Sequence, residues 1–247
     1  MGSSRLPGKV LKDLAGKPLL LQILNQLKAV SAEVVPVIAC STDERDDELV
    51  RFGQSHGITV SRGPADDIVA RLAGAARSVN APSILRVWGD CPFVCPDVVE
   101  AMVSDFESRG LDYLTNGESA RRTLPVGLDV ELYRAPLLDE MNSGTGDAFY
   151  REFPLQYVLS RGSALKWDVY APRGEYPHAH MTVDYPEDLV AANEIYRRLS
   201  PEGRAFRSYE LFALLEREPA LIERFSQQAR QADFKEKQKQ HQQGKIG

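Results

Sequence analysis

Residues 1–18 read MGSSRLPGKVLKDLAGKP, and we expect the rest of the fold to be organised around them. Small residues, a bend at Pro7-Gly8 and the cations Arg5, Lys9, Lys12 and Lys17 stand there beside one acid, in a chain of formal net charge -5. Glycine and serine let the backbone approach a ligand, while arginine and lysine bind phosphate oxygens. The stretch therefore predicts an anion site; the alternative is a surface turn with solvated cations.

This stretch does not match the common nucleotide-binding motifs. Five residues separate Gly2 from Gly8, where a P-loop has four, and Val10 stands where a P-loop has a metal-binding serine or threonine. It is not a dinucleotide fingerprint either. If it binds phosphate, it does so as a different kind of loop.

The composition is that of an ordinary soluble domain. Of the 247 residues, 43% are hydrophobic and 26% are charged, and we see no apolar run of about 18 residues that could span a membrane. The acidic pI of about 5.5 argues against a general nucleic-acid binder. Cys40, Cys91 and Cys95 cannot all pair, and no nearby histidine completes a zinc site. We expect a cytoplasmic protein with reduced thiols that binds neither membranes nor nucleic acids.

The first hundred residues alternate between helical and strand patterns. Apolar residues recur at helical spacing after Pro18, and continuous apolar runs of strand length follow, which suits parallel strands covered on both faces. Alternation at this period is typical of βαβ units. We predict that residues 1–110 form half of an α/β, doubly wound arrangement with a mostly parallel central sheet. The expected helices are 18–30, one that follows a cap-rich turn at 41–43 and ends near 56, 66–79 and 96–108, and the expected strands are 34–40, 58–61 and 83–88.

The second half reads as α+β laid on the same sheet. Residues 1–231 are predicted to form one domain, with 111–199 as its second half and 200–231 as C-terminal helices. Residues 232–247 are rich in Lys, Gln and Glu and are expected to be disordered or a frayed helix. The other expected elements are strands 112–115, 127–133, 164–170 and 179–183, helices 135–141 and 186–199, a loop at 142–146, and a helix pair within 208–231.

Two carboxylates stand directly after predicted strands. Asp90 and Asp184 would lie at the carboxyl ends of their strands, where open α/β sheets bind ligands. Together they could hold a hard divalent cation, although Asp184 with Glu187 also reads as a helix-capping box. His178 and His180 are spaced to share one face of a strand, but no third ligand accompanies them.

Four motifs in order resemble one enzyme family. They are SSRLPGK at residues 3–9 with GKP at 16–18, GDCP at 89–92, GLDVE at 127–131 and DYPEDL at 184–189. This order is similar to that of the cytidylyltransferases, which activate acidic sugars as CMP conjugates. The resemblance covers roughly residues 1–218, and is strongest to the branch known as spore coat polysaccharide biosynthesis protein F, akin to the CMP-KDO and acylneuraminate synthetases.

The resemblance implies a nucleotide-diphospho-sugar transferase fold, which is Rossmann-like, with residues 1–110 as the nucleotide-binding half and 111–199 as the sugar side and possible dimer region. CTP would bind over the opening loop, and a sugar hydroxyl would attack the α-phosphate and expel pyrophosphate. Phosphoryl-type transfer depends on positioning and charge neutralisation, which cations and magnesium supply. The general base is open between Asp129 and a hydroxyl activated by the metal. The implied roles are nucleotide binding by Ser4, Arg5, Gly8, Lys9, Lys17, Arg62, Asp67 and Arg71, Mg²⁺ binding by Asp90 and Asp184, sugar-side contacts by Asp129 and Glu131, and catalysis by Lys9, Asp90 and Asp129.

Ordinary alternation on a half-exposed strand explains Asp129 and Glu131 equally well. The chain also departs from the family in two places. Members of the family begin with a buried apolar strand just before this loop, so we expect the first strand to be missing here, from a central position between the strands at Val34 and Ser83, which would expose apolar surface and unpaired backbone. The stretch at 146–154 lacks the Arg-Glu-His-Val-Thr-like sequence of that branch.

Three alternatives remain open at the level of the sequence. They are a nucleotidyltransferase for another base, a glycosyltransferase of the same fold, and a non-catalytic protein that binds sugar nucleotides. A glycosyltransferase would normally show Asp-x-Asp after a strand, and here a single acid, Asp90, ends the strand. The family commonly forms dimers, so we expect a homodimer with contacts within residues 124–173.

Overall fold

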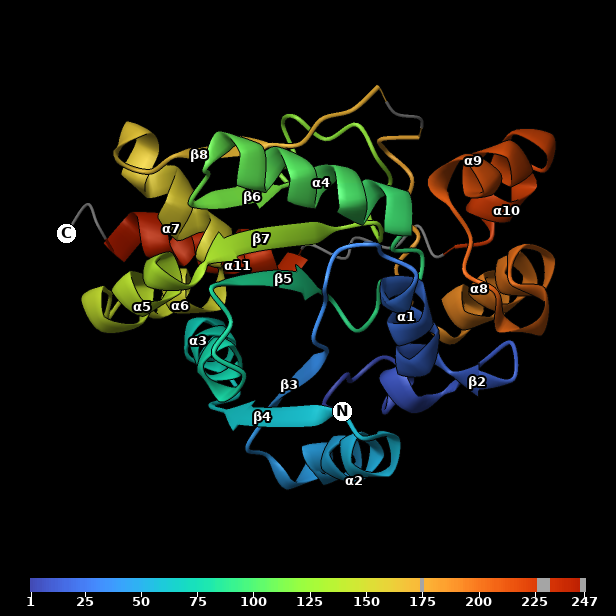
Figure 1. The fold of residues 1–247 in the computed structure, drawn as a ribbon, viewed down its shortest axis with the longest axis horizontal. Helices are drawn as coiled ribbons and strands as arrows, with labels where there is room; N and C mark the ends of the chain where they lie inside the picture. Colours follow the sequence, from blue (N-terminus) through green and yellow to red (C-terminus); the bar gives the residue numbers. More distant parts are fainter. Residues whose placement is uncertain (174–175, 226–231, 245–247) are drawn as a thin grey trace.

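The alternation of helix and strand in the first half is confirmed in the computed structural model, which describes residues 1–173, 176–225 and 232–244 (Figure 1). Most predicted elements lie within a few residues of their expected positions. The strand expected from residue 34 begins only at Val37, after Pro36, which has no N–H to donate to a ladder. The elements are η1 (Lys9–Leu11), β1 (Asp13–Leu14), β2 (Lys17–Pro18), α1 (Leu19–Lys28), β3 (Val37–Ser41), η2 (Glu44–Asp46), α2 (Asp47–His56), β4 (Thr59–Gly63), α3 (Ile68–Ser78), β5 (Ser83–Val87) and α4 (Pro96–Arg109).

Local sequence signals explain where these helices begin and end. The Asp67 side chain caps α3 by accepting a hydrogen bond from the backbone N–H of Ala70. Helix α4 begins at Pro96, which suits a first turn whose N–H groups have no helical partner, and it ends at Gly110 in the left-handed conformation. The buried faces of both helices turn toward the strands, so the caps fix the layers around the sheets.

The second half forms a four-stranded mixed sheet with the end of the first. Its order is β5-β7-β6-β8; β7 is antiparallel to both β5 and β6, and only β6 and β8 pair in parallel. The prediction of a mostly parallel sheet is therefore wrong for this part. The elements are β6 (Tyr113–Thr115), β7 (Val130–Arg134), α5 (Ala135–Gly144), α6 (Ala148–Glu152), α7 (Pro154–Arg161), η3 (Gly162–Ala164), β8 (Trp167–Val169), α8 (Pro186–Leu199), η4 (Pro201–Gly203), α9 (Ser208–Arg217), α10 (Ala220–Glu223) and α11 (Ala232–Gly244).

Three predictions for the second half need correction or completion. The strand expected at 179–183 is extended chain that meets its neighbour only at an isolated bridge between Val126 and His180. The loop expected at 142–146 is partly helical, because α5 continues to Gly144. In the tail, where disorder or a frayed helix is expected, Ala232–Gly244 forms a helix. The end of the predicted helix pair, 226–231, lies outside the described residues.

Strands β3 and β5 belong to separate sheets, and the position between them is the one from which the sequence predicts a strand to be missing. Strands β3 and β4 form a parallel pair with Val37 opposite Thr59, and β5 belongs to the separate four-stranded sheet. Within the described residues, β3 and β5 pair neither with each other nor with a strand between them. One edge of each strand is therefore open.

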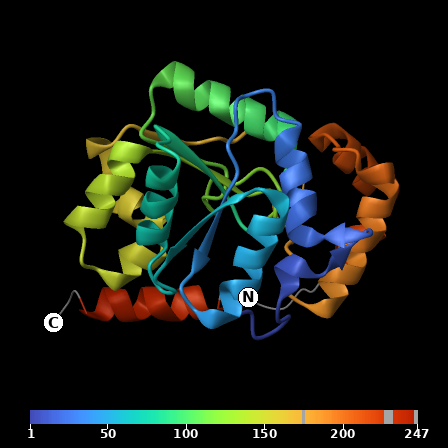
Figure 2. The ribbon, with the colours of Figure 1, turned by 60° about the horizontal axis from the view of Figure 1, so that its bottom comes forward.

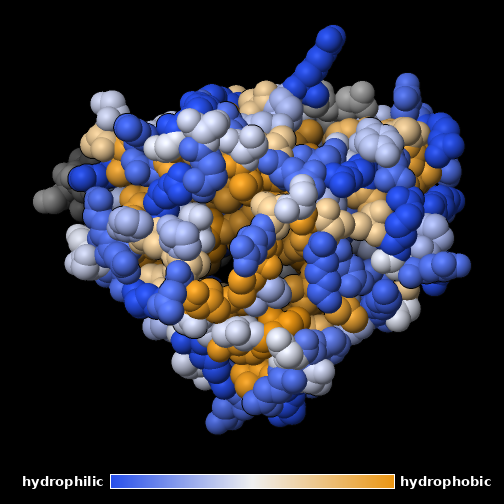
Figure 3. Space-filling model, viewed as in Figure 1, coloured by the Kyte–Doolittle hydropathy of each residue, from blue (hydrophilic) through white to orange (hydrophobic). Residues whose placement is uncertain are grey.

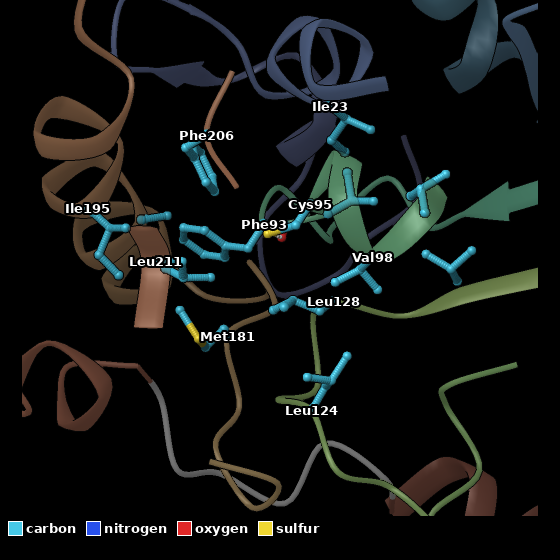
Figure 4. Close-up of a cluster of buried hydrophobic side chains, with 14 of the residues drawn as sticks. Ile23, Phe93, Cys95, Val98, Leu124, Leu128, Met181, Ile195, Phe206 and Leu211 are labelled. Atoms are coloured by element: carbon cyan, nitrogen blue, oxygen red, sulfur yellow. Dashed lines mark hydrogen bonds between the residues drawn. The ribbon is translucent and has the colours of Figure 1, made fainter. Parts of the chain in front are cut away.

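The largest hydrophobic core includes Leu6 of the opening loop and side chains of α1, α4, α8 and α9. Phe93, Met102, Phe206 and Leu211 are fully buried there, between α4 and the C-terminal helices (Figure 4). Figures 1 and 2 show α8, α9 and α10 together at one end of the molecule, and α5, α6, α7 and α11 at the other. Among the helices that the structure describes, none has both the length and the apolar character needed to cross a bilayer.

Candidate functional site

The loop at residues 3–9 is a tight turn held on the core by one apolar side chain. Leu6 is buried, and its N–H donates to Ser3 Oγ at 3.2 Å. Gly8 has a φ of 66°, a left-handed conformation that a side chain would strain, and it precedes the 3-10 helix η1. Ser4 and Arg5 are exposed on the turn, and Lys9 follows it. The turn therefore fixes the backbone and presents its two cations on one side.

Lys9 joins the two carboxylates that the sequence singles out. Its Nζ lies 2.7 Å from Asp90 Oδ2 and 2.9 Å from Asp184 Oδ1, and its side chain is only 14% exposed. Burial lowers the pKa of Lys9, but the charges and hydrogen bonds of the two carboxylates outweigh burial and raise the pKa above its ordinary value. The predicted meeting of the opening loop, Asp90 and Asp184 is thus present in the structure.

Two close backbone contacts bring these acids to the loop. A Cβ on Gly89 would lie 2.9 Å from Val10 Cγ1, so a larger residue at this position would press on the Val10 side chain of η1. The N–H of Val183 donates to the carbonyl of Asp90 at 2.9 Å, which ties the segment before α8 to the same strand end. Asp90 and Asp184 therefore converge although 94 positions separate them in the sequence.

The capping role considered for Asp184 belongs to another residue. Asp188 Oδ2 accepts hydrogen bonds from the backbone N–H groups of Asp184 (2.9 Å) and Tyr185 (2.8 Å), and Tyr185 is the N-cap of α8. The alternative of a box formed by Asp184 and Glu187 is wrong. The Asp184 carboxylate points instead toward the loop, where it accepts from Lys9 and, through Oδ2, from Thr182 Oγ1.

Arg5 adds a second cation at the open side of the cluster. Its Nη2 lies 3.3 Å from Asp184 Oδ1, and its guanidinium lies over the Tyr185 ring, 5.2 Å from the centroid. The side chain is 40% exposed, so it can turn toward an incoming anion while it stays on the ring. Sequence reasoning missed Tyr185, although its position directly after Asp184 was a signal.

The acids of this cluster fit a hard divalent cation. Asp90 and Asp184 already share one cationic group, the Lys9 ammonium, and both offer oxygen atoms. Among the described residues, no group of three or more His, Cys, Asp or Glu side chains is placed to hold a metal. Magnesium is commonly held by one or two carboxylates together with substrate phosphates and water, so a pair of acids suits it.

Asp129 lies near this cluster in an ion pair of its own. Its Oδ1 is 2.6 Å from Arg122 Nη1, and its Oδ2 accepts from the N–H of Gly127 at 3.1 Å. Burial raises the pKa of Cys91 well above its ordinary value, and the negative charges of Asp90 and Asp129 raise it further. Arg122 was not predicted from the sequence. The feature that could have indicated a partner for Asp129 is the pair Arg121-Arg122 ahead of it.

Glu131 belongs to a sealed network inside the sheet, which favours the structural alternative over a sugar contact. It is 4% exposed and accepts hydrogen bonds from Arg86 Nη1 (2.9 Å), Tyr113 Oη (2.8 Å) and Tyr133 Oη (2.6 Å). Three donors occupy its oxygens, so a ligand would have to displace one of them. The alternating pattern in the sequence indicates a half-exposed strand, and it therefore does not predict that Glu131 is buried.

Arg62 and Lys17 make contacts within the protein. Arg62 donates to the backbone carbonyls of Ser41 and Asp43 and pairs with Asp47 at 2.7 Å, so it fastens β3 to β4 and α2. The end of the Lys17 side chain lies next to Gly203, in the 3-10 helix η4 that precedes α9. The structure thus places both cations in structural contacts rather than in the Lys9 cluster.

Asp67 and Arg71 are likewise engaged where α3 begins. Besides its capping bond, Asp67 pairs with Arg151 at 2.6 Å. The Arg71 guanidinium donates to the carbonyls of Pro64 (3.2 Å) and Ala65 (2.6 Å), and burial lowers the pKa of this side chain. These bonds hold the turn that the sequence assigns to the nucleotide side.

Comparison with known proteins identifies what this arrangement resembles. Residues 1–191 match the model of the family described as cytidylyltransferase. The chain is 28% identical over 226 residues to the spore coat polysaccharide biosynthesis protein SpsF of Bacillus subtilis (strain 168), covering 89% of this chain and 92% of the relative. It is 35% identical over 153 residues to the 3-deoxy-manno-octulosonate cytidylyltransferase of Anaeromyxobacter dehalogenans (strain 2CP-1 / ATCC BAA-258), covering 60% of this chain and 58% of that protein.

Solved structures show the same fold. A cytidylyltransferase from Leptospira borgpetersenii serovar Hardjo-bovis (strain JB197) superposes with a TM-score of 0.82 at 25% identity, covering 93% of this chain and 95% of that one. CMP:2-keto-3-deoxy-manno-octonic acid synthetase, solved in complex with CTP, superposes with a TM-score of 0.59 at 18% identity, covering 80% of this chain and 95% of that chain. The α/β, Rossmann-like nucleotide-sugar transferase fold predicted from the sequence is confirmed.

Proposed function

The chain belongs to the cytidylyltransferase family, and from that premise we propose that it transfers CMP from CTP to a hydroxyl group of an acidic sugar. The observation that carries the proposal is the convergence of Arg5, Lys9, Asp90 and Asp184 at the loop. The names of two relatives supply the substrate class and the setting, since one is a 3-deoxy-manno-octulosonate cytidylyltransferase and the other a spore coat polysaccharide biosynthesis protein. We therefore place the reaction in the biosynthesis of a surface polysaccharide.

The proposed reaction is a substitution at the α-phosphorus of CTP. The sugar hydroxyl oxygen forms a bond to that phosphorus, the bond from the phosphorus to the oxygen bridging to the β-phosphate breaks, and pyrophosphate leaves with the electron pair. The proton of the hydroxyl passes to a base, and Asp129 is the candidate on the sugar side. Its ion pair with Arg122 holds that carboxylate in place.

The chain's own charges suit the phosphates of this substrate. Lys9 and Arg5 would exchange their carboxylate partners for phosphate oxygens, and so neutralise charge on the leaving pyrophosphate. Asp90 and Asp184, freed from Lys9, would hold magnesium, which when bound would supply charge neutralisation at the phosphates. The raised pKa of Lys9 keeps its ammonium charged at neutral pH, as this exchange requires.

Pyrophosphate release tests the proposal. The purified chain is offered CTP, UTP, GTP or ATP with magnesium, together with a panel of 2-keto acid sugars and their neutral counterparts. We expect release from CTP with an acid sugar, and none with Asp90→Asn. Release only from another nucleotide would identify an enzyme for a different base. Measurable binding of CTP without release from any acceptor would make the chain a binding protein.

A further inference from the structure

Helix α11 is polar, and its stability depends on contacts with another element. It spans Ala232–Gly244, and its sequence, ADFKEKQKQHQQG, has few apolar residues. Isolated helices shorter than about 12–15 residues are marginal in water even when their sequence favours helix, so a polar helix of this length needs a surface to dock on. In the structure α11 packs against α6, and Figures 1 and 2 show both helices at the same end of the molecule.

Two side chains of α11 contact α6 at both of its ends. Lys237 Nζ lies 2.7 Å from Oε1 of Glu152, the last residue of α6. His241 follows one turn later in α11 and is therefore on the same face of that helix. Its Nδ1 is 3.5 Å from Oδ1 of Asp147, the N-cap of α6, and its ring stacks on Phe149 with the centroids 4.4 Å apart and the planes at 22°. The His241 side chain is only 14% exposed, so these contacts enclose it.

The short helix α6 has little support of its own. It spans five residues, which is less than two turns, and none of them is buried. It lies within residues 146–154, the stretch where the chain departs from the pattern of the branch that it resembles, and the proposed reaction gives this stretch no role. The ring of Phe149 and the acids Asp147 and Glu152 make it a surface that matches an aromatic and a basic side chain of α11.

Arg151 connects α6 to the start of α3. Its Nη2 is 2.6 Å from Asp67 Oδ2, and its Nη1 donates to the carbonyls of Asn142 (3.0 Å) and Thr145 (2.9 Å). Asp67 caps α3 and follows the turn that Arg71 holds by its hydrogen bonds. A displacement of α6 would therefore release the first turn of α3.

The position of α3 depends on such contacts because one of its faces borders a cavity. The volume of the cavity is about 690 Å³, and it is lined mainly by aliphatic side chains of α1, α3, β3 and β5, which include Ile68, Leu72 and Ala75 of α3. Figure 3 shows hydrophobic side chains gathered around this hollow. Where α3 lines the cavity it lacks packing partners, so the elements at its sides, among them β4, α5 and α6, fix its position.

We propose that α11 is a strap that holds α6 in place when it docks through Lys237 and His241. In turn, α6 fixes the first turn of α3 through the pair of Arg151 and Asp67. Because Asp67 and Arg71 lie where the family resemblance places the nucleotide, undocking of α11 would lower the affinity for CTP. This last step rests on the proposed function, whereas the strap itself does not.

Hydrogen exchange of the full chain tests the strap. His241→Ala removes the ring stack and Lys237→Glu brings two like charges together, while Gln242→Ala and Lys239→Glu make similar changes at exposed positions of α11. We expect the amides of α6 and of the first turn of α3 to exchange about tenfold faster in His241→Ala and about threefold faster in Lys237→Glu. The two controls should stay within about twofold of wild type, and adding Glu152→Lys to Lys237→Glu should restore slow exchange. Equal exchange in the variants and their controls would overturn the proposal. Protection that increases with protein concentration would do so too, because α11 would then come from a second copy of the chain.

A second variant tests the path from α6 to α3. Arg151→Gln breaks the pair with Asp67, so His241→Ala should add no further change to the exchange of α3 in that background. Faster exchange confined to α11 and α6 when Arg151 is intact would contradict the strap.

CTP binding, measured by calorimetry on the same preparations, separates the strap from the proposed function. We expect the Kd for CTP to rise about threefold in His241→Ala and to stay unchanged in Gln242→Ala. A wild-type chain that does not bind CTP would refute the proposed function, and the exchange rates would still decide whether α11 is a strap. Equal CTP affinity in His241→Ala despite faster exchange at α3 would show that the strap does not act on the nucleotide.

Discussion

Two buried networks of charge lie in this molecule and differ in what they leave available. In the Lys9 cluster, one ammonium serves two carboxylates, and Arg5 connects them to solvent. In the Glu131 network, one carboxylate receives three donors and is enclosed by fully buried tyrosines. The first cluster has a cation, Arg5, that is 40% exposed, whereas the donors of the second are buried. Exchangeable partners, rather than burial or charge alone, distinguish a ligand site from structural support.

The pKa shifts follow the same division. Burial lowers the pKa of Arg86, but Glu131 and Tyr133 outweigh it and keep the guanidinium charged. Burial raises the pKa values of Tyr113 and Tyr133 well above their ordinary range, and the Glu131 charge raises them further, so both hydroxyls remain donors. Every proton in this network is fixed. The Lys9 cluster, in contrast, is the one in which we propose that magnesium replaces the ammonium.

The largest effect that we expect is a loss of pyrophosphate release when Asp90 of the Lys9 cluster is changed. Asp90→Asn removes one of the two charges proposed to hold magnesium, and we expect pyrophosphate release to fall at least about 10³-fold. The fold should stay intact, because this side chain is 26% exposed and its backbone contacts are unchanged. Turnover and urea unfolding measured on the same preparation check both parts. Retention of activity would remove Asp90 from the metal site.

In the Glu131 network, we expect a substitution to lower stability and to leave the sugar KM unchanged. Glu131→Gln leaves the Arg86 guanidinium buried beside a neutral amide, and we expect the free energy of unfolding to fall by about 3 kcal/mol. The KM for the sugar should not change in the folded fraction. Asp129→Asn, two positions away, is the comparison variant: it also breaks a buried ion pair, with Arg122, so we expect a loss of stability of similar size and, in addition, altered sugar kinetics. An altered sugar KM in Glu131→Gln with normal stability would return Glu131 to the sugar side.

The sequence predicts the first network better than the second. Apolar periodicity indicates the strands, and strand ends in an α/β sheet are ligand sites, so Asp90 could be found from its position. Glu131 looks the same in the sequence, because alternation along a strand does not tell which face another layer seals. Tyr113 and Arg86 reach it only through the pairing of β6 and β5 with β7, which local patterns do not encode. The cap formed by Asp188 depends in the same way on side-chain geometry.

Lys9→Met tests whether the ammonium holds the apo cluster together. We expect CTP affinity to fall about tenfold and the free energy of unfolding at pH 7 to fall by about 2 kcal/mol, because two carboxylates lose their shared partner. The pKa of Lys9 is raised in the folded protein, so its stabilisation is complete below the ordinary value of 10.5 and is lost as pH rises through the folded pKa. The difference in stability between wild type and variant should therefore stay constant from neutral pH to about pH 10 and close above it. Urea unfolding between pH 7 and 12 measures this, and a difference that does not depend on pH would contradict the ion pairs.

The smallest expected effect concerns Arg5, which is the part of the cluster most open to solvent. Arg5→Lys keeps the charge but loses the planar fork and most of the contact with the Tyr185 ring, so we expect the KM for CTP to rise about fivefold with kcat unchanged. If the ring guides the guanidinium from Asp184 to the phosphates, Tyr185→Leu should give a similar rise, and the double variant should be little worse than either single one. Full additivity would show that Arg5 binds phosphate without the ring. Arg5 alone would then be the part of the cluster that moves to the phosphates. The difference between this cluster and the Glu131 network would then depend on Lys9 and its two carboxylates.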